Sequence, residues 1–445
     1  MSSGPILVFA CRWCSLLGAE RAARERLPLP DGLRIIPIDC AGSVSPEKVL
    51  EALLNGAAGV AVMGCHMGGC RHNDANRDAH VRISVLKDLL DAVGLDGRRL
   101  LVSWGDAHEA KGFSDVLQKF AYRLSQLPDM PLPQALPAHA AVPVMRPRPL
   151  PTQEQDEDLR EKARQALKNG FRVLALGKGP LGTQPALFAD ESGLDAITAG
   201  CKHPMAKLAW RILKDQAAGA LTGADAEGAL RTEFLDAAPE KPLAVACRAC
   251  DARALRQQAA LNQFAYEPLE ILRIECSEEQ KKYCACADCS WPDEEPAPCG
   301  EASAEAPRGR EFWEKEFSRC VQCHWCSQAC PVCICPSCSL DGNAMLPAGS
   351  IPPSPLGYHL ARAMHVADAC VNCGACQDAC PQGLPLLLLH KAVSRSLKKA
   401  GYASGRGKAS PMLRQRLLAQ ADKNGIVTPR WGSDISINAE TPLER

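Results

Sequence analysis

Two cysteine runs near the C-terminal end place the strongest limits on what this chain can fold around. Each run has the spacing C-x-x-C-x-x-C-x-x-x-C-P. This is the bacterial ferredoxin pattern, in which the fourth cysteine of each run binds the cluster of the other run. Structural zinc sites more often use isolated C-x-x-C pairs. The sequence therefore predicts two [4Fe–4S] clusters, the first on Cys320, Cys323, Cys326 and Cys380, the second on Cys370, Cys373, Cys376 and Cys330.

Three further thiols directly follow the first run, at Cys333, Cys335 and Cys338. The two predicted clusters do not need them, and no fourth ligand is adjacent. Cys247, Cys284 or Cys299 could supply one from elsewhere. An extra cluster, a zinc site and thiols without a metal all stay open as interpretations. Between the runs, residues 352–369 are expected to form a helix, on which His365 would tune a cluster or simply be packed.

Composition limits the setting in which these cysteines work. The chain has 445 residues, 24 of them cysteine, with 51 basic and 51 acidic side chains. Zero formal charge gives no field that would gather nucleic acid or an anionic membrane. No signal peptide is visible, and the longest apolar run, 384–389, is too short to span a bilayer. We expect a cytoplasmic protein with protein partners, in which thiols serve metals rather than disulfides.

The chain is expected to divide into an N-terminal domain (1–128), a proline-rich linker (129–157), a middle domain (158–308), a cysteine-rich domain (309–402) and a tail (403–445). Strands at 6–10, 33–38, 59–63 and 100–103 alternate with helices, one of which is expected at about 81–93. This order favours α/β architecture with a doubly wound parallel sheet. The middle domain is expected to show the same alternation of helices and strands, beginning with a helix at 158–169. The cysteine-rich domain should be a mainly helical dicluster ferredoxin-like unit, and one helix is expected at 412–421 in the tail.

Cysteines in the N-terminal region follow the predicted strands. They are Cys11, Cys14, Cys40, Cys65 and Cys70. The carboxyl ends of parallel strands meet at one edge of a sheet, where α/β proteins place their sites. Four of these five thiols can therefore bind a [2Fe–2S] or [4Fe–4S] cluster.

In the middle domain, cysteines again follow predicted strands, although fewer of them follow each strand. A further [4Fe–4S] cluster is predicted on Cys250, Cys276, Cys286 and Cys289, with scattered core cysteines as the alternative. The pattern Gly177-x-Gly179-x-x-Gly182 has the form of a dinucleotide fingerprint, but Pro180 within it argues against the helix that such a fingerprint must open.

The N-terminal motifs Cys11-Arg12-Trp13-Cys14 and Gly64-Cys65-His66-Met67-Gly68-Gly69-Cys70 resemble the delta subunit of methyl-viologen-reducing hydrogenase. That resemblance implies a [2Fe–2S] cluster that passes electrons from a hydrogenase to the flavin subunit of heterodisulfide reductase.

The rest of the chain is similar to beta-type iron–sulfur subunits associated with formate dehydrogenases and hydrogenases. Its landmarks are Thr183-Gln184-Pro185, Cys247-Arg248-Ala249-Cys250 and the segment from Phe317 to Cys338. Those relatives usually lack a cysteine at the position of Cys247, which implies that Cys250 is the ligand. The segment Ala361-Arg362-Ala363-Met364-His365 also resembles the gamma subunit of heterodisulfide reductase.

Together these features predict an electron-transfer subunit, with no catalytic site of its own required. It would relay electrons between the catalytic subunit of a formate dehydrogenase or hydrogenase and a heterodisulfide reductase-like flavoprotein. One alternative is a self-sufficient flavin- or nicotinamide-linked oxidoreductase with its substrate site in the middle domain. Another is a zinc or scaffold protein without redox activity. The sequence leaves the donor, the acceptor and the direction of electron flow open.

Overall fold

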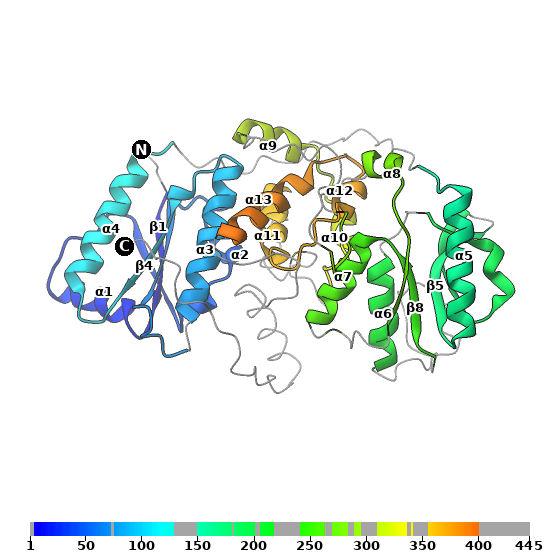
Figure 1. Cartoon of the computed structure of the whole chain (residues 1–445). Helices are drawn as coiled ribbons and strands as arrows, with labels where there is room; N and C mark the ends of the chain where they lie inside the picture. The colour runs from blue at the N-terminus through cyan, green and yellow to red at the C-terminus, as the bar shows by residue number, and fades with distance from the viewer. Residues whose placement is uncertain are drawn as a thin grey trace.

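The computed structural model describes residues 4–72, 75–128, 149–179, 182–200, 205–217, 241–261, 263, 269–283, 289–294, 309–335, 340 and 355–399. Three groups of elements lie in a row (Figure 1). A sheet with its helices stands at one end, a second sheet with its helices stands at the other, and the helices of the cysteine-rich segment lie between them. The cysteine-rich segment, although late in the sequence, therefore occupies the middle of the molecule.

The N-terminal sheet is fully parallel, with strand order β2-β1-β3-β4. Its strands are β1 (Ile6–Cys11), β2 (Leu33–Ile38), β3 (Gly59–Cys65) and β4 (Leu100–Gly105). Helices α1 (Ser15–Arg24) and α4 (Ala110–Ser125) pack on one face, and α2 (Pro46–Leu54) and α3 (Ala75–Ala92) pack on the other. The central strand β3 is buried along its whole length, which explains its uninterrupted apolar sequence. The predicted parallel sheet is confirmed.

A second sheet has strand order β6-β5-β8-β9, with β7 paired to β5. Strands β5, β8 and β9 run parallel, whereas β6 and β7 are antiparallel to β5, so the sheet is mixed. Its strands are β5 (Arg172–Gly179), β6 (Gly182–Phe188), β7 (Ile197–Thr198), β8 (Leu243–Cys247) and β9 (Glu270–Arg273). Helices α5 (Gln153–Lys168), α6 (Met205–Ala217) and α7 (Ala249–Ala260) pack against it, and the short α8 (Glu278–Tyr283) follows β9.

The glycine-rich pattern of the middle region forms a hairpin. Gly179 pairs with Gly182 at the point where β5 and β6 meet, and the chain continues into β6 rather than into a helix. A dinucleotide fingerprint needs a helix N-terminus at this point. The hairpin thus agrees with the expectation, drawn from Pro180, that this glycine-rich pattern does not open a nucleotide-binding helix.

Helix α5 begins at Gln153, earlier than the start expected at residue 158. Thr152 caps the helix by accepting a hydrogen bond from the backbone of Gln155, whose side chain in turn accepts one from the backbone of Thr152. This reciprocal capping box satisfies two backbone donors. Most of the expected linker, the expected tail helix and the tail itself lie outside the described residues.

The cysteine-rich segment is helical where the structure describes it. Its helices are α9 (Arg310–Ser318), α10 (Trp325–Gln328), α11 (Pro355–His365), α12 (Ala375–Asp378) and α13 (Leu386–Lys399). Short helices α10 and α12 each follow the second cysteine of a ferredoxin run. His324 and Gly374, which precede them, have left-handed backbone conformations that turn the chain between cysteines.

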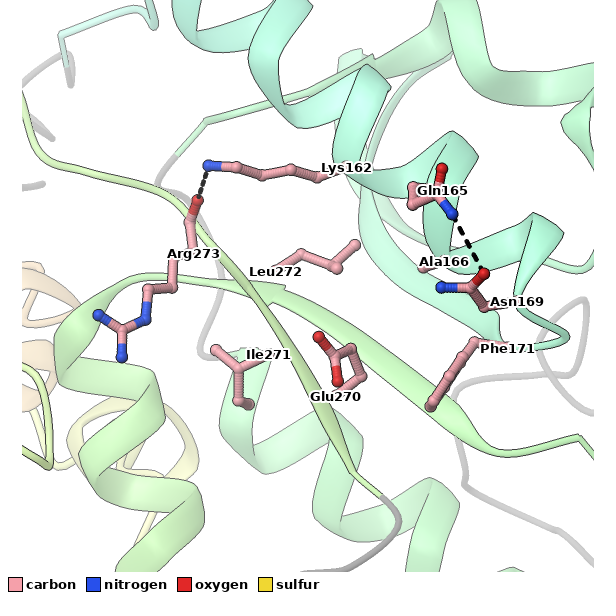
Figure 2. A pocket seen from close by; sticks show the side chains of 9 residues that line it. All are labelled: Lys162, Gln165, Ala166, Asn169, Phe171, Glu270, Ile271, Leu272 and Arg273. Carbon is pink, nitrogen blue, oxygen red and sulfur yellow. Dashed lines mark hydrogen bonds between the residues drawn. The ribbon is translucent and has the colours of Figure 1, made fainter.

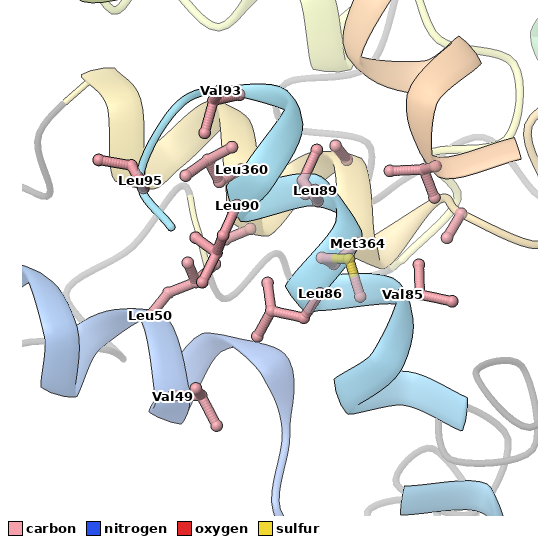
Figure 3. Packing of buried hydrophobic residues seen from close by; sticks show 14 of the residues in the cluster. Val49, Leu50, Val85, Leu86, Leu89, Leu90, Val93, Leu95, Leu360 and Met364 are labelled. Atoms are coloured by element: carbon pink, nitrogen blue, oxygen red, sulfur yellow. The ribbon is translucent and has the colours of Figure 1, made fainter. Parts of the chain in front are cut away.

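The N-terminal sheet and the central helices share one hydrophobic core (Figure 3). Leu86, Leu89 and Leu90 of α3 pack with Leu360 and Met364 of α11. Polar contacts close the edges of this interface, since the Trp313 indole donates to the Ala92 carbonyl at 3.0 Å and the Ser396 hydroxyl donates to Asp88 at 2.7 Å. Glu47 of α2 forms an ion pair with His365 of α11.

The central helices also contact the second sheet and its helices. Lys207 of α6 donates to the carbonyl oxygens of Ser327 and Gln328, at 3.2 and 2.8 Å. Gln258 of α7 donates to the Pro331 carbonyl at 2.5 Å. Val371 packs into the core of the second sheet. Across the described residues, no helix combines the length and the apolar character needed to cross a membrane.

Candidate metal centres

The five N-terminal cysteines lie together at the carboxyl edge of the parallel sheet, as expected from their positions. Cys11 and Cys65 end strands β1 and β3. Cys14 precedes α1, Cys40 follows β2, and Cys70 lies in the loop after β3. We call these five residues the N-terminal thiol site.

Within the N-terminal thiol site the sulfurs meet in pairs. The Cys40 and Cys70 sulfurs are 3.8 Å apart. On the other side, the Cys65 sulfur lies 3.9 Å from that of Cys11 and 2.8 Å from that of Cys14. Two thiolates bound to one tetrahedral metal at about 2.3 Å would be separated by about 3.8 Å. The separations of 3.8 and 3.9 Å therefore fit a centre in which each metal takes two cysteines, whereas the 2.8 Å separation of Cys14 and Cys65 is too short for such a pair.

Burial and crowding raise the pKa of three of these thiols, Cys14, Cys40 and Cys65. Burial and the neighbouring Cys70 together raise the pKa of Cys40 to about 12, despite the hydrogen bond from the Gly42 amide. Burial likewise raises the pKa of Cys65 well above its ordinary value, with added contributions from Cys14 and Cys11. A bound metal would have to displace these protons, so occupancy should couple to both pH and folding.

Side chains around the thiol site hold its loops and cover its rim. The buried Asn76 amide donates to the carbonyl oxygens of Cys65 and His66, which fixes the loop after β3. At the surface, the Arg71 guanidinium lies over the Trp13 ring at 4.4 Å from its centroid, and the ring stays 42% exposed. The thiol site therefore opens toward an exposed aromatic residue.

The first predicted C-terminal cluster site comprises Cys320, Cys323, Cys326 and Cys380. The structure brings these four residues close enough for their charges to interact. Burial and the charges of the other three thiols together raise the pKa of Cys320 to about 11. Cys323 is exposed, whereas Cys326 is buried. This site thus lies near the molecular surface.

The second predicted C-terminal cluster site comprises Cys330, Cys370, Cys373 and Cys376. All four line one small enclosed cavity, together with apolar side chains such as Val332, Val366 and Leu387. Burial raises the pKa of Cys370 to about 12. Four thiols around one cavity, whose other lining residues are apolar except for His390, supply the donor set that a [4Fe–4S] cluster needs, one thiolate for each iron.

Sequence reasoning missed three buried side chains that surround the C-terminal sites. The His359 ring lies 3.3 Å from the Cys320 sulfur and stacks on Phe317. Burial and the nearby Arg362 lower the pKa of His359 to about 3, so its ring is neutral at pH 7. Arg362 and His390 lie between the two sites. Their signal was available, because His359 and Arg362 are three residues apart on one helix that also carries the apolar Leu360 and Met364.

His365, the histidine that the sequence singled out on this helix, contacts Glu47. Its role in the structure is therefore to join α11 to the N-terminal sheet. Of the two expectations for His365, a packed histidine is the one that matches its position.

The three additional thiols are only partly described. Cys333 lies against Cys330, and burial together with that contact raises its pKa well above the ordinary value. Cys335 is exposed. Cys338 lies outside the described residues, as do Cys284 and Cys299. The interpretations of this trio therefore stay as predictions.

The cysteines of the middle region lie near the carboxyl ends of β8 and β9. Cys250 lies in the first turn of α7, and the sulfur of Cys276 accepts a hydrogen bond from Arg248 at 3.3 Å. Cys289 is in a disulfide, which would have to be reduced before this residue could bind iron. Cys286 lies outside the described residues. The neighbouring Cys247 is fully buried at the end of β8.

A pocket of about 430 Å³ lies beside the second sheet, between α5 and β9 (Figure 2). Its polar side chains are bonded to neighbours. Lys162 donates to the Arg273 carbonyl at 2.9 Å, and Gln165 donates to Asn169 at 3.1 Å. Binding sites usually present convergent polar groups to a ligand. This pocket does not have that character and contains no cysteine.

In the parts of the chain that the structure describes, no three histidine, cysteine or acidic side chains surround a single metal position. A mononuclear zinc site needs such a set. In iron–sulfur clusters each iron takes only one or two protein ligands, the rest being sulfide. The paired N-terminal thiols and the four thiols around the C-terminal cavity match the second description better.

Comparisons with known proteins match two separate segments of the chain. The family described as "Methyl-viologen-reducing hydrogenase, delta subunit" matches residues 6–128, and the family described as "4Fe-4S binding domain" matches residues 364–384. The latter segment carries three ligands of the second cluster site and Cys380 of the first.

Relatives of known description match about a quarter of this chain. An iron–sulfur subunit of the F420-non-reducing hydrogenase of Archaeoglobus profundus is 34% identical over 122 residues, which are 27% of this chain and 89% of the relative. One subunit of the ferredoxin/F420H2-dependent CoB-CoM heterodisulfide reductase of Methanosarcina acetivorans is 38% identical over 122 residues, or 27% of this chain and 15% of the relative. The beta subunit of the F420-dependent formate dehydrogenase of Methanocaldococcus jannaschii is 38% identical over 104 residues, or 23% of this chain and 27% of the relative.

The chain thus spans only about 15% of the heterodisulfide reductase subunits that it matches, but nearly the whole hydrogenase iron–sulfur subunit. Through its N-terminal sheet and thiol site, this chain belongs to the methyl-viologen-reducing hydrogenase delta-subunit family.

Proposed function

We propose that the chain is an iron–sulfur electron-transfer subunit. It relays electrons between the catalytic subunit of a formate dehydrogenase or hydrogenase and a heterodisulfide reductase-like flavoprotein. The observation that carries the proposal is the continuity of the molecule, because the two C-terminal cluster sites lie in helices that share a core with the N-terminal sheet. The names of the relatives support the partners, since they belong to hydrogenase, heterodisulfide reductase and formate dehydrogenase.

In this proposal the N-terminal thiol site holds a [2Fe–2S] cluster on four of its five cysteines. The first and second C-terminal cluster sites each hold a [4Fe–4S] cluster. A third [4Fe–4S] cluster would use Cys250, Cys276, Cys286 and Cys289. Each cluster accepts one electron and releases one electron, and the protein sets its potential through burial, charge and hydrogen bonds to sulfur. The chain's own residues bind and insulate the clusters.

Metal analysis tests the composition. Anaerobically purified protein should contain roughly fourteen irons per chain with matching acid-labile sulfide, as three cubanes and one [2Fe–2S] require. Iron near ten would remove the middle cluster. Stoichiometric flavin would favour the alternative of a self-sufficient oxidoreductase, and zinc without iron would contradict the proposal.

Freeze-quench EPR tests the relay itself. One electron per chain is introduced by photoreduction, and its appearance on each cluster is followed with time. We expect exchange between the C-terminal and N-terminal clusters in the native protein. In Cys40→Ser the electron should stay on the C-terminal clusters. Clusters that are present but never exchange electrons would contradict a relay.

A further inference from the structure

Arg362 is a buried arginine that touches both C-terminal cluster sites. Its side chain is 3% exposed. It donates to the carbonyl oxygen of Cys326, a residue of the first site, at 2.9 Å. Its strongest electrostatic partners also include Cys330 and Cys376, which belong to the second site. The guanidinium therefore lies between the two predicted clusters.

Among the described residues, the hydrogen bonds of Arg362 include none to a carboxylate that would compensate its charge. Its partners include a carbonyl oxygen, a histidine nitrogen and the sulfurs of Cys376 and, at 4.0 Å, Cys333. None of these is a carboxylate, and its leading electrostatic partners are all cysteines. An uncompensated cation in a protein interior is costly. A cluster bound by four thiolates carries net negative charge, which would supply the missing compensation.

His390 extends this arrangement to the wall of the second site. Arginine can only donate, so the 3.2 Å contact between Arg362 and His390 Nε2 makes that nitrogen an acceptor. The proton of the neutral ring must then be on Nδ1, which is buried without a hydrogen-bond partner among the described atoms. His390 lines the cavity that contains the four cysteines. Arg362 therefore also fixes the orientation of a donor beside the second cluster.

We propose that Arg362 is a shared counter-charge of the two C-terminal clusters and raises the reduction potentials of both. Reduction adds one negative charge to a cluster, so a fixed positive charge nearby stabilises the reduced form more than the oxidised form. Net charge and hydrogen bonding are established determinants of cluster potential. Arg362 itself gains and loses nothing. The inference rests on the proposed function, because it requires clusters at both sites.

The test compares redox titrations of native protein, Arg362→Met and Arg362→Lys, followed by EPR, with iron counted in each sample. Methionine fills similar volume without charge, which is the replacement that buried ionic groups tolerate best. Both C-terminal midpoint potentials should fall in Arg362→Met and return toward native values in Arg362→Lys. Arg99→Met is the matched control, because Arg99 is equally buried but bonds to the Ala58 carbonyl in the N-terminal sheet. It should leave those two midpoints unchanged.

Each outcome of these titrations either supports or overturns the proposed role of Arg362. Retained iron with unmoved midpoints in Arg362→Met overturns the counter-charge. If Arg362→Met loses iron, the result for Arg362→Lys decides. Two clusters at near-native potentials in Arg362→Lys would support the role of the positive charge. Loss of the clusters in Arg362→Lys as well would show that the shape of the guanidinium matters, and would overturn the proposal. Native protein without two [4Fe–4S] clusters would overturn the proposed function itself, together with this inference.

Discussion

At the scale of single residues, the N-terminal thiol site makes a sharper prediction than its cysteine count. Cys40 and Cys70 form one sulfur pair, and the second pair must come from Cys11, Cys14 and Cys65. Serine at Cys40 or at Cys70 should therefore abolish the N-terminal EPR signal. Of the serine variants at Cys11, Cys14 and Cys65, one should keep the signal, because only two of these three cysteines are needed. Cys201, isolated in the sequence, is the control, and Cys201→Ser should keep full iron. A signal that survives Cys40→Ser would refute the pairing.

The C-terminal cysteines couple iron binding to folding. Cys373 lines the cavity of the second site, and Cys323 belongs to the first. Without a cluster, the clustered thiols leave the surrounding short helices without their organising centre. We expect Cys373→Ser and Cys323→Ser each to lower both iron content and soluble yield, as measured on anaerobic preparations. Native iron and yield in both variants would contradict this coupling.

At the scale of elements, Trp313 helps to fix α9 to the rest of the molecule. Trp313 is buried, stacks on Phe317 at 5.3 Å between ring centroids, and donates to the Ala92 carbonyl at the end of α3. Trp313→Phe keeps most of the stack but loses the hydrogen bond. We expect a loss of about 1 kcal/mol in the free energy of unfolding.

Thermal or denaturant unfolding of holo-protein measures this loss. Trp325→Phe is the matched control, since Trp325 is 50% exposed and should change the free energy of unfolding little. Equal effects at the two positions would show that the Ala92 hydrogen bond contributes nothing specific.

The sequence predicts helices and strands best where they form continuous buried apolar runs. In the N-terminal sheet, strand β2 has the expected bounds and β1, β3 and β4 differ from theirs by two residues or fewer, because buried apolar runs mark parallel strands clearly. Strands β6 and β7 of the second sheet were not predicted. The start of α3 at Ala75, rather than near residue 81, was missed because its first turns carry polar side chains. Two of these, Asn76 and Asp78, are buried, and Asn76 holds the cysteine loop. A functional requirement thus hid the helix from a search for apolar periodicity.

At the scale of the whole molecule, the ion pair between Glu47 and His365 links α2 to α11. Burial alone would raise the pKa of Glu47, but the hydrogen bond and charge of His365 hold it at about 2, below its ordinary value of 4.5. Because the folded-state pKa is depressed, the contribution to stability is complete above pH 4.5 and is lost as the pH falls toward 2.

Glu47→Gln should therefore lower the free energy of unfolding by about 1–3 kcal/mol at pH 7, since the carboxylate that contacts His365 would be lost. The difference from native protein should shrink as the pH drops below 4.5. Glu20→Gln, at an exposed pair with Arg24, serves as the control and should have little effect. A loss that does not depend on pH would assign the stabilisation to packing rather than to charge.

The three-part arrangement itself could not be read from the sequence. The spacing of the cysteines predicts the ligands, because iron–sulfur chemistry demands thiols at close intervals. No local pattern states that α3 packs on α11, some 260 residues later in the chain, since the partner of an apolar face is set by tertiary structure. The one available signal was that the apolar arc of α3 is wide, with Ile83, Val85, Leu86, Leu89 and Leu90 all buried.

The shared core also has a consequence for synthesis. When α3 leaves the ribosome, the helices that will cover its outer face have not yet been translated. At about 5–20 residues per second, α11 follows roughly 13–50 s later. During that interval Leu86 and Leu89 lack their partners from α11, Leu360 and Met364. The nascent N-terminal part should therefore depend on a chaperone during translation, and a truncated gene product that ends before α9 should aggregate even when its own cluster is supplied.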